Sequence, residues 1–146
     1  MKVTYKGEYA IRALLYLCSR YPNTDIVPIG DISRRQNIPE KYLEQILLIL
    51  KKSGHVASKR GANGGFYLPK APAEITLGEI IRTIEGSLEP VSNNDRTNNL
   101  YDLALREIWQ KVTQAISAVV DTVTFADIMR RAEELRQVKN EYNYDI

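Results

Sequence analysis

Side chains able to bind nucleic acid gather on one face of a helix predicted over Glu40–Ser53. At 100° per residue, this polar face carries Lys41, Glu44, Gln45 and Lys52. The opposite face, within about 100° of arc, is apolar and carries Leu43, Ile46, Leu47 and Leu50. Ammonium, carboxylate and amide groups on one helical face can read base edges or bind phosphate. The alternative is a solvated helix face, the commoner fate of such residues. Leu48 lies within the polar face. A thymine methyl group and a neighbouring segment of the protein are the two candidate contacts of its side chain.

The next residues have the pattern of a β-hairpin with a basic, glycine-rich tip. His55–Ser58 has strand composition, and Phe66–Leu68 is its expected partner. The glycines of the intervening KRGANGG permit positive φ and close backbone approach. Arg60 in this loop supplies a planar donor fork suited to a narrow minor groove. A nucleotide-phosphate loop is excluded, because the GxxxxGKS or GxxxxGKT pattern is missing and no helix follows the glycines.

Two helices must hold this stretch from the N-terminal side. Lys6–Arg20 carries one apolar stripe that includes Cys18, so we expect that thiol in the core. Pro28–Gln36 forms a second, shorter helix, and the turn Asn37–Pro39 joins it to the third. Two short helices joined by a three-residue turn are the helix-turn-helix pattern, which alone is a weak signal. A further helix over Thr76–Gly86 should pack under the hairpin and brace it.

Composition and charge limit the classes of function that this chain can have. The 146 residues are 44% apolar and 26% charged, enough for a core in a globular chain. Residues 1–70 carry twelve Lys and Arg against five Asp and Glu, whereas residues 71–146 carry eight against thirteen. A basic front and an acidic back suggest that only the front meets a polyanion, although chance placement of solubility charge is the alternative. One cysteine excludes an intrachain disulfide and fits a reducing cytosol. No stretch is apolar enough to span a membrane or to act as a signal peptide.

The C-terminal half is dominated by one periodic stretch, residues 100–123. Its apolar positions include Leu105, Ile108, Trp109, Val112, Ile116 and Val119. As a helix it would extend about 35 Å at 1.5 Å per residue. This is too long for one small domain to cover, so we expect these residues to contact a second chain, with packing on its own domain as the alternative. Thr124 is the expected N-cap of a short last helix.

The predicted organisation is mainly α with a small β-hairpin wing. A winged helix-turn-helix domain covers 1–86, with the wing at about 55–68, and an Asn-rich linker covers 87–99. The dimerisation helix and the short C-terminal helix cover 100–137, and a polar, loose tail covers 138–146.

Four stretches together resemble the Rrf2 family of bacterial transcription regulators. They are KGEYAIRALLYL, DISRRQNIPEKYLEQIL, SKRGANGGFYL and ITLGEIIRTIEG, and they cover roughly residues 1–90. The resemblance implies a winged helix-turn-helix repressor or activator that binds a palindromic operator as a homodimer. In the family, the YLEQ helix enters the major groove and the wing arginine enters the minor groove. Carried over, Tyr42, Glu44, Gln45 and Arg60 become readout residues. Further expected DNA contacts are Lys6, Lys41, Lys52, Lys59 and Asn63.

Many family members bind an iron–sulfur cluster through three cysteines placed before the dimer helix. Here that segment reads EPVSNNDRTNNLYDL and has no cysteine, and Arg106 replaces a histidine that some members use. Cluster ligation needs thiolates or imidazoles, so we expect no cofactor and no metal. The chain thus resembles the cluster-free branch, which includes cysteine-metabolism regulators that sense through a partner enzyme, a cysteine synthase.

The expected function is sequence-specific DNA binding in the bacterial cytoplasm, as a repressor of sulfur, cysteine or iron–sulfur metabolism genes. A competing function is a protein-interaction module that docks a metabolic enzyme and has lost DNA binding; Leu48 and the acidic rear half support it. We expect no catalysis, because no Ser/His/Asp, Cys/His or metal constellation is present.

Overall fold

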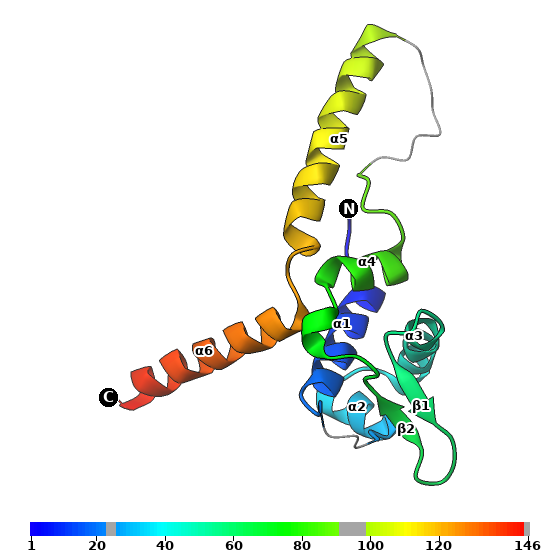
Figure 1. Cartoon of the computed structure of the whole chain (residues 1–146), viewed down its shortest axis with the longest axis vertical. Helices are drawn as coiled ribbons and strands as arrows, with labels where there is room; N and C mark the ends of the chain where they lie inside the picture. Colours follow the sequence, from blue (N-terminus) through cyan, green and yellow to red (C-terminus); the bar gives the residue numbers. More distant parts are fainter. Residues whose placement is uncertain (23–25, 91–98, 145–146) are drawn as a thin grey trace.

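The computed structural model describes residues 1–22, 26–90 and 99–144. Its elements are α1 (Tyr5–Cys18), α2 (Ile29–Gln36), α3 (Glu40–Lys52), β1 (Ala57–Lys59), β2 (Gly65–Tyr67), a 3₁₀ turn η1 (Pro72–Glu74), α4 (Leu77–Glu85), α5 (Leu100–Val120) and α6 (Phe125–Tyr144). Figure 1 shows a helical domain with a small hairpin, from which α5 and α6 project in different directions. The predicted class, mainly α with a β-hairpin wing, is confirmed.

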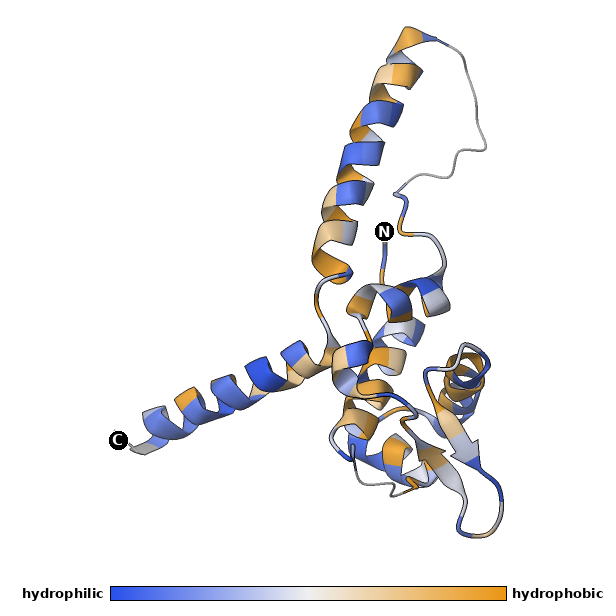
Figure 2. Cartoon of the chain, viewed as in Figure 1, coloured by the Kyte–Doolittle hydropathy of each residue, from blue (hydrophilic) through white to orange (hydrophobic). Residues whose placement is uncertain are grey.

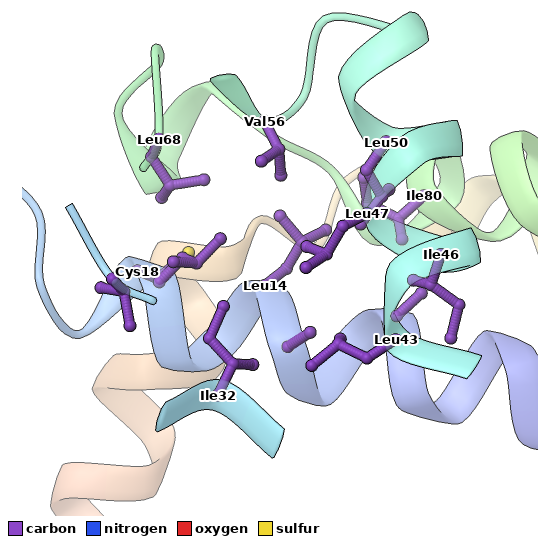
Figure 3. Close-up of a cluster of buried hydrophobic side chains, with 14 of the residues drawn as sticks. Leu14, Cys18, Ile32, Leu43, Ile46, Leu47, Leu50, Val56, Leu68 and Ile80 are labelled. Carbon is purple, nitrogen blue, oxygen red and sulfur yellow. The ribbon is translucent and has the colours of Figure 1, made fainter. Parts of the chain in front are cut away.

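The core forms around α1, which α2, α3, α4 and α6 surround. Leu14 from α1, Ile32 from α2 and Leu47 from α3 are fully buried in it (Figure 3). All four apolar residues predicted to face inward from α3 are buried.

Cys18 is 1% exposed, and burial raises the pKa of its thiol to about 12. The predicted core position of Cys18 is confirmed, and its thiol stays protonated at neutral pH.

A left-handed residue makes the corner between α2 and α3. Asn37 ends α2 with φ of 52°, a conformation that Asn tolerates better than most residues. The Ile38 N–H donates to the Ser33 carbonyl at 3.0 Å, and Ser33 Oγ donates to the Ile38 carbonyl at 2.6 Å. Arg12 of α1 donates to the Gln36 carbonyl at 3.0 Å, which fixes this corner on α1.

The wing is a short antiparallel pair in which Ala57, Ser58 and Lys59 lie opposite Tyr67, Phe66 and Gly65. Val27 adds a third segment, because its N–H donates to the Phe66 carbonyl and its carbonyl accepts from the Phe66 N–H, at 2.8 and 2.9 Å. This segment passes so close to Gly65 that a Cβ there would overlap with the Val27 carbonyl. Gly61, at the tip, has φ of +118°, which other residues rarely adopt.

Helix α4 packs on α1, α3 and α5. Thr76 begins it with a capping box: Thr76 Oγ1 accepts from the Glu79 N–H at 3.2 Å, and the Glu79 carboxylate accepts from the Thr76 N–H at 2.8 Å. The carboxylate also accepts from Thr76 Oγ1 at 3.1 Å, and the hydrogen bonds that it accepts from the N–H and the hydroxyl of Thr76 lower the pKa of Glu79. The sequence predicts that α4 braces the wing from below. In the structure, Thr83 of α4 meets the residues that lead into β1, because Thr83 Oγ1 lies 3.4 Å from His55 Nε2.

The last helix differs from its prediction. Thr124 does begin it, since Thr124 Oγ1 accepts from the Asp127 N–H at 3.1 Å. The helix then continues to Tyr144, through residues predicted to form a loose tail. Three ion pairs of i,i+3 spacing stabilise it: Arg130–Asp127, Arg131–Glu134 and Arg136–Glu133. Figure 2 shows that α6 is mostly hydrophilic, whereas α5 carries apolar residues where it stands away from the domain.

Of the predicted linker 87–99, residues 91–98 lie outside the described part of the chain. Leu88, within the predicted linker, is buried against α4 and α5. Within the ranges that the structure describes, no helix is both long and apolar enough to span a membrane.

Candidate nucleic-acid interface

The outer face of α3 presents every polar residue predicted for it. Lys41, Tyr42, Glu44, Gln45 and Lys52 are all exposed. Leu48 lies among them with 52% of its surface exposed, which confirms that it does not join the core. The packing of Leu43 and Leu47 against the core fixes the rotation of α3, and so directs this polar face outward.

An apolar groove of about 460 Å³ runs between the outer faces of α1 and α3. It is lined by Tyr5, Lys6 and Tyr9 from α1 and by Tyr42, Gln45 and Ile46 from α3. The predicted contact Lys6 therefore lies beside two predicted contacts of α3, although Lys6 and Tyr42 are 36 positions apart in the sequence. Tyr5 and Tyr9 stack in a tilted pair with ring centroids 6.3 Å apart, and the Arg12 guanidinium lies over the Tyr9 ring at 4.9 Å.

Sequence reasoning missed Tyr5 and Tyr9. The available signal was two tyrosines four residues apart on either side of Lys6, on the side of the first helix away from its apolar stripe. That spacing places both rings on one helical face.

The wing carries the other predicted contacts at its tip. Lys59, Arg60 and Asn63 are exposed, and Arg60 follows β1 directly. Among the described residues, no carboxylate lies within ion-pair distance of the predicted basic contacts on α1, α3 or the wing: Lys6, Lys41, Lys52, Lys59 and Arg60. By contrast, Arg34, Arg82, Arg130, Arg131 and Arg136 each pair with a carboxylate. The charges of the predicted DNA contacts on α1, α3 and the wing therefore remain available for an anionic partner.

His55 connects α3 to the wing and is buried, with 7% of its surface exposed. Its Nδ1 has no hydrogen-bond partner within the described part of the chain. Burial lowers the pKa of His55; the charge of Glu79 opposes this shift and that of Lys70 adds to it. The imidazole is therefore neutral at pH 7, and sequence reasoning gave it no role beyond the start of a strand.

The residues predicted to contact a second chain fall into two groups. Leu105, Ile108, Trp109 and Val119 are exposed large apolar residues, with Ile108 at 53%. Val112 is half-buried. Ile116 is half-buried too, and it packs on a small cluster of this chain's own Ile81, Leu88 and Val120. The outer part of α5 thus keeps an uncovered apolar surface, while its last turns are attached to α4.

Taken together, a helix-turn-helix with an exposed polar third helix, a hairpin with an exposed arginine at its tip and a long projecting helix define a winged helix-turn-helix transcription regulator. The model of the Rrf2 family, described as an iron-dependent transcriptional regulator, matches residues 3–131. The chain belongs to the Rrf2 family.

Relatives named as transcriptional regulators, not enzymes, span nearly the same length. The HTH-type transcriptional regulator CymR of Bacillus subtilis is 34% identical over 128 residues, which cover 88% of this chain and 89% of CymR. The solved structure of T. potens IscR has a TM-score of 0.73 at 36% identity, covering 92% of this chain and 90% of that one. The structure of CymR, titled the global cysteine regulator of B. subtilis, also has a TM-score of 0.73, at 32% identity, covering 88% and 95%.

The iron named in the family description can be tested against the donors of this chain. Thiolates are the usual ligands of an iron–sulfur cluster. The sequence contains one cysteine and one histidine. Cys18 is in the core with a raised pKa, and His55 is buried behind the wing. No group of three or more His, Cys, Asp or Glu in the described ranges could hold a metal ion. These residues do not fit a cluster.

Proposed function

We propose that this Rrf2-family regulator binds a palindromic operator in double-stranded DNA as a homodimer. The observation that carries the proposal is the exposed face of α3, whose cations form no ion pair with any residue that the structure describes, followed by a hairpin that bears Arg60 at its tip. Lys41, Tyr42, Glu44 and Gln45 would contact bases and phosphates in the major groove. Arg60 would enter the adjacent minor groove. Lys6, Lys52, Lys59 and Asn63 would bind phosphates, which position the protein without reading sequence.

The second copy is supported by α5. Its 21 residues extend about 31 Å at 1.5 Å per residue, and Leu105, Ile108 and Trp109 are exposed along it. A contiguous apolar face of this kind is typical of a protein–protein contact. Two copies joined by α5 would present two α3 helices related by a twofold axis, which an operator with inverted half-sites matches.

We further infer that the protein is a repressor acting in the bacterial cytoplasm on sulfur, cysteine or iron–sulfur metabolism genes, without a cluster of its own. The similarity to CymR, whose structure is titled a global cysteine regulator, and the unsuitable metal donors support this inference. A cysteine synthase is the class of partner enzyme that could then supply the signal.

The experiment is selection of genomic DNA fragments by the purified protein, followed by sequencing. We expect enrichment of one inverted repeat. On that repeat, log affinity should fall linearly with log salt, by about 0.9 per phosphate neutralised. Enrichment of no sequence, with an affinity equal to that for random DNA, would contradict the proposal.

A protein-interaction module is the second candidate, and exposed Leu48 favours it. If the chain had this function, capture from cell lysate would recover a metabolic enzyme, and substitution of Leu48 by Ala would abolish the capture. In a gel shift with the same preparation, DNA would then remain unbound.

A further inference from the structure

The carboxylate of Glu85 joins the two ends of the winged domain. Glu85 lies in the last turn of α4. Its Oε1 accepts hydrogen bonds from the Thr4 backbone N–H at 2.8 Å and from Thr4 Oγ1 at 2.7 Å. The two residues are 81 positions apart in the sequence. Thr4 immediately precedes α1, so this contact holds the start of the helix that carries Lys6.

Thr4 occupies the N-cap of α1, yet its hydroxyl does not serve as a cap. An N-cap hydroxyl ordinarily accepts from the second or third N–H of its helix. Here the Thr4 side chain makes no such bond and donates to Glu85 instead. Gly7 lies so close to this contact that a Cβ there would overlap with Glu85 Oε1. The first turn of α1 is therefore positioned by α4 and not by its own cap.

The position of Glu85 also opposes the helix dipole. A carboxylate is disfavoured in the last turn of a helix, where the partial charge is negative. Two hydrogen bonds across the domain compensate for this unfavourable place. One turn earlier, Arg82 binds the other neighbour of α4: its Nη1 and Nη2 donate to the two carboxylate oxygens of Asp121, the C-cap of α5, at 2.5 and 2.9 Å. Consecutive turns of α4 thus hold α5 and α1.

We propose that Glu85 is a positioning residue for DNA binding: it fixes the first turn of α1 so that Lys6 lies beside α3 at the phosphate backbone. This inference rests on the proposed function. It also makes α4 the link between the dimerisation helix and the DNA-binding face, through Arg82 on one side and Glu85 on the other.

The proposal predicts an effect opposite in sign to simple electrostatics. Removing a carboxylate from a protein that binds a polyanion should strengthen binding. Loss of the Thr4 contact should weaken it, because Lys6 would no longer be held in place. Glu85→Gln keeps an oxygen that can accept from Thr4, whereas Glu85→Ala removes the acceptor. Both variants have the same net charge, so their difference isolates the position of the first turn.

The experiment measures affinity for the selected operator by fluorescence anisotropy, over a series of salt concentrations, with folding checked by circular dichroism. We expect Glu85→Ala to bind roughly threefold to tenfold more weakly than Glu85→Gln. The slope of log affinity against log salt should also fall for Glu85→Ala, by up to about 0.9 per lost phosphate contact. Lys6→Ala should cause a similar loss of slope, and adding Glu85→Ala to it should cause little more.

Gly7→Ala provides an independent variant. Alanine is favoured over glycine within a helix, so the substitution should not unfold the protein. Its Cβ would displace the Glu85 carboxylate, and DNA affinity should fall as it does in Glu85→Ala. Equal affinities and salt slopes for folded Glu85→Ala and Glu85→Gln would overturn the proposal.

Arg60→Ala, measured in parallel, separates this failure from failure of the proposed function. If Arg60→Ala weakens binding while the two Glu85 variants agree, DNA binding stands and the role of Glu85 is wrong. If Arg60→Ala binds like the unmodified protein, the proposed DNA contacts themselves are wrong.

Discussion

Leu47 and Leu48 are adjacent in α3, yet Leu47 is fully buried and Leu48 has 52% of its surface exposed. The 100° step between helical neighbours is enough to carry one side chain into the core and the next into the polar face. We expect Leu47→Ala to lower the free energy of unfolding by about 2–5 kcal/mol, because it leaves a cavity. Leu48→Ala should change it by less than about 0.5 kcal/mol. Urea unfolding of both variants tests this, and equal losses would contradict the orientation of α3.

Arg60→Ala should weaken operator binding by about 1–3 kcal/mol, because an arginine inserted in a narrow minor groove would be lost. The matched control is Arg136→Ala, which removes the same charge from α6, where the arginine pairs with Glu133. Isothermal titration with the selected operator compares the two. Similar losses in both variants would mean that Arg60 acts only through net charge.

Ile108→Glu should convert the proposed dimer to monomers, because it places a charge in the middle of the uncovered apolar face of α5. Gln110→Glu adds the same charge two residues away, on the opposite side of the helix, and should leave the dimer intact. Sedimentation velocity at several concentrations measures the state of each variant. A dimer that persists in Ile108→Glu would place the interface elsewhere.

Stability should depend on pH through His55. Its pKa is lowered in the folded chain, so below the ordinary value near 6.5 the unfolded chain takes up a proton that the folded chain does not. Stability should therefore be full above about pH 7 and fall as the pH drops below that value. The slope cannot exceed about 1.4 kcal/mol per pH unit for one proton.

Unfolding by urea between pH 7 and pH 5 checks this in the unmodified protein and in His55→Gln, at one fixed protein concentration. The carboxylates of Glu79, Asp121 and Asp127 also have lowered pKa values, so they titrate in the folded chain at more acidic pH. The pH dependence in this window should thus be flatter in His55→Gln. An unchanged slope would assign the dependence to another group.

Gly65→Ala should destabilise the wing by about 1–3 kcal/mol, because its Cβ would meet the backbone of Val27, which cannot rotate away. Gly30→Ala is the control, since its Cβ would meet open space near the start of α2. Hydrogen exchange of the Phe66 and Val27 amides reports the pairing directly. Faster exchange in both variants would point to a general loss of stability.

The sequence predicted the winged domain well because its signals are local. The periodicity of α3, the glycine after it and the strand residues on either side of KRGANGG each act over a few residues, and the observed bounds differ from the predicted ones by one or two residues. The length of α6 was missed for a physical reason. Its last residues, from 138 to 144, are mostly polar, and a polar helical end has no apolar periodicity that would distinguish it from a loose tail. The i,i+3 ion pairs of α6 lie before this stretch, between residues 127 and 136.

Contacts between distant segments could not be predicted from one sequence. The Glu85–Thr4 hydrogen bonds, the Val27–Phe66 pairing and the groove between α1 and α3 depend on how the helices pack, and that packing has no local signature. The same holds for His55, whose burial follows from α4 covering the start of the wing.

Two of the three glycines of the wing have a consequence for engineering new operator preferences. Gly61 is required by its positive φ and Gly65 by the passing Val27 backbone, so the frame of the hairpin allows little variation. The side chains at positions 41, 44, 45 and 48 of α3 have no comparable restriction, since they are exposed on the surface of a regular helix. A designer seeking a regulator for a different DNA sequence should therefore randomise positions 41, 44, 45 and 48 and leave the hairpin frame untouched. In a library that varies the wing glycines, most members would be proteins with a damaged wing.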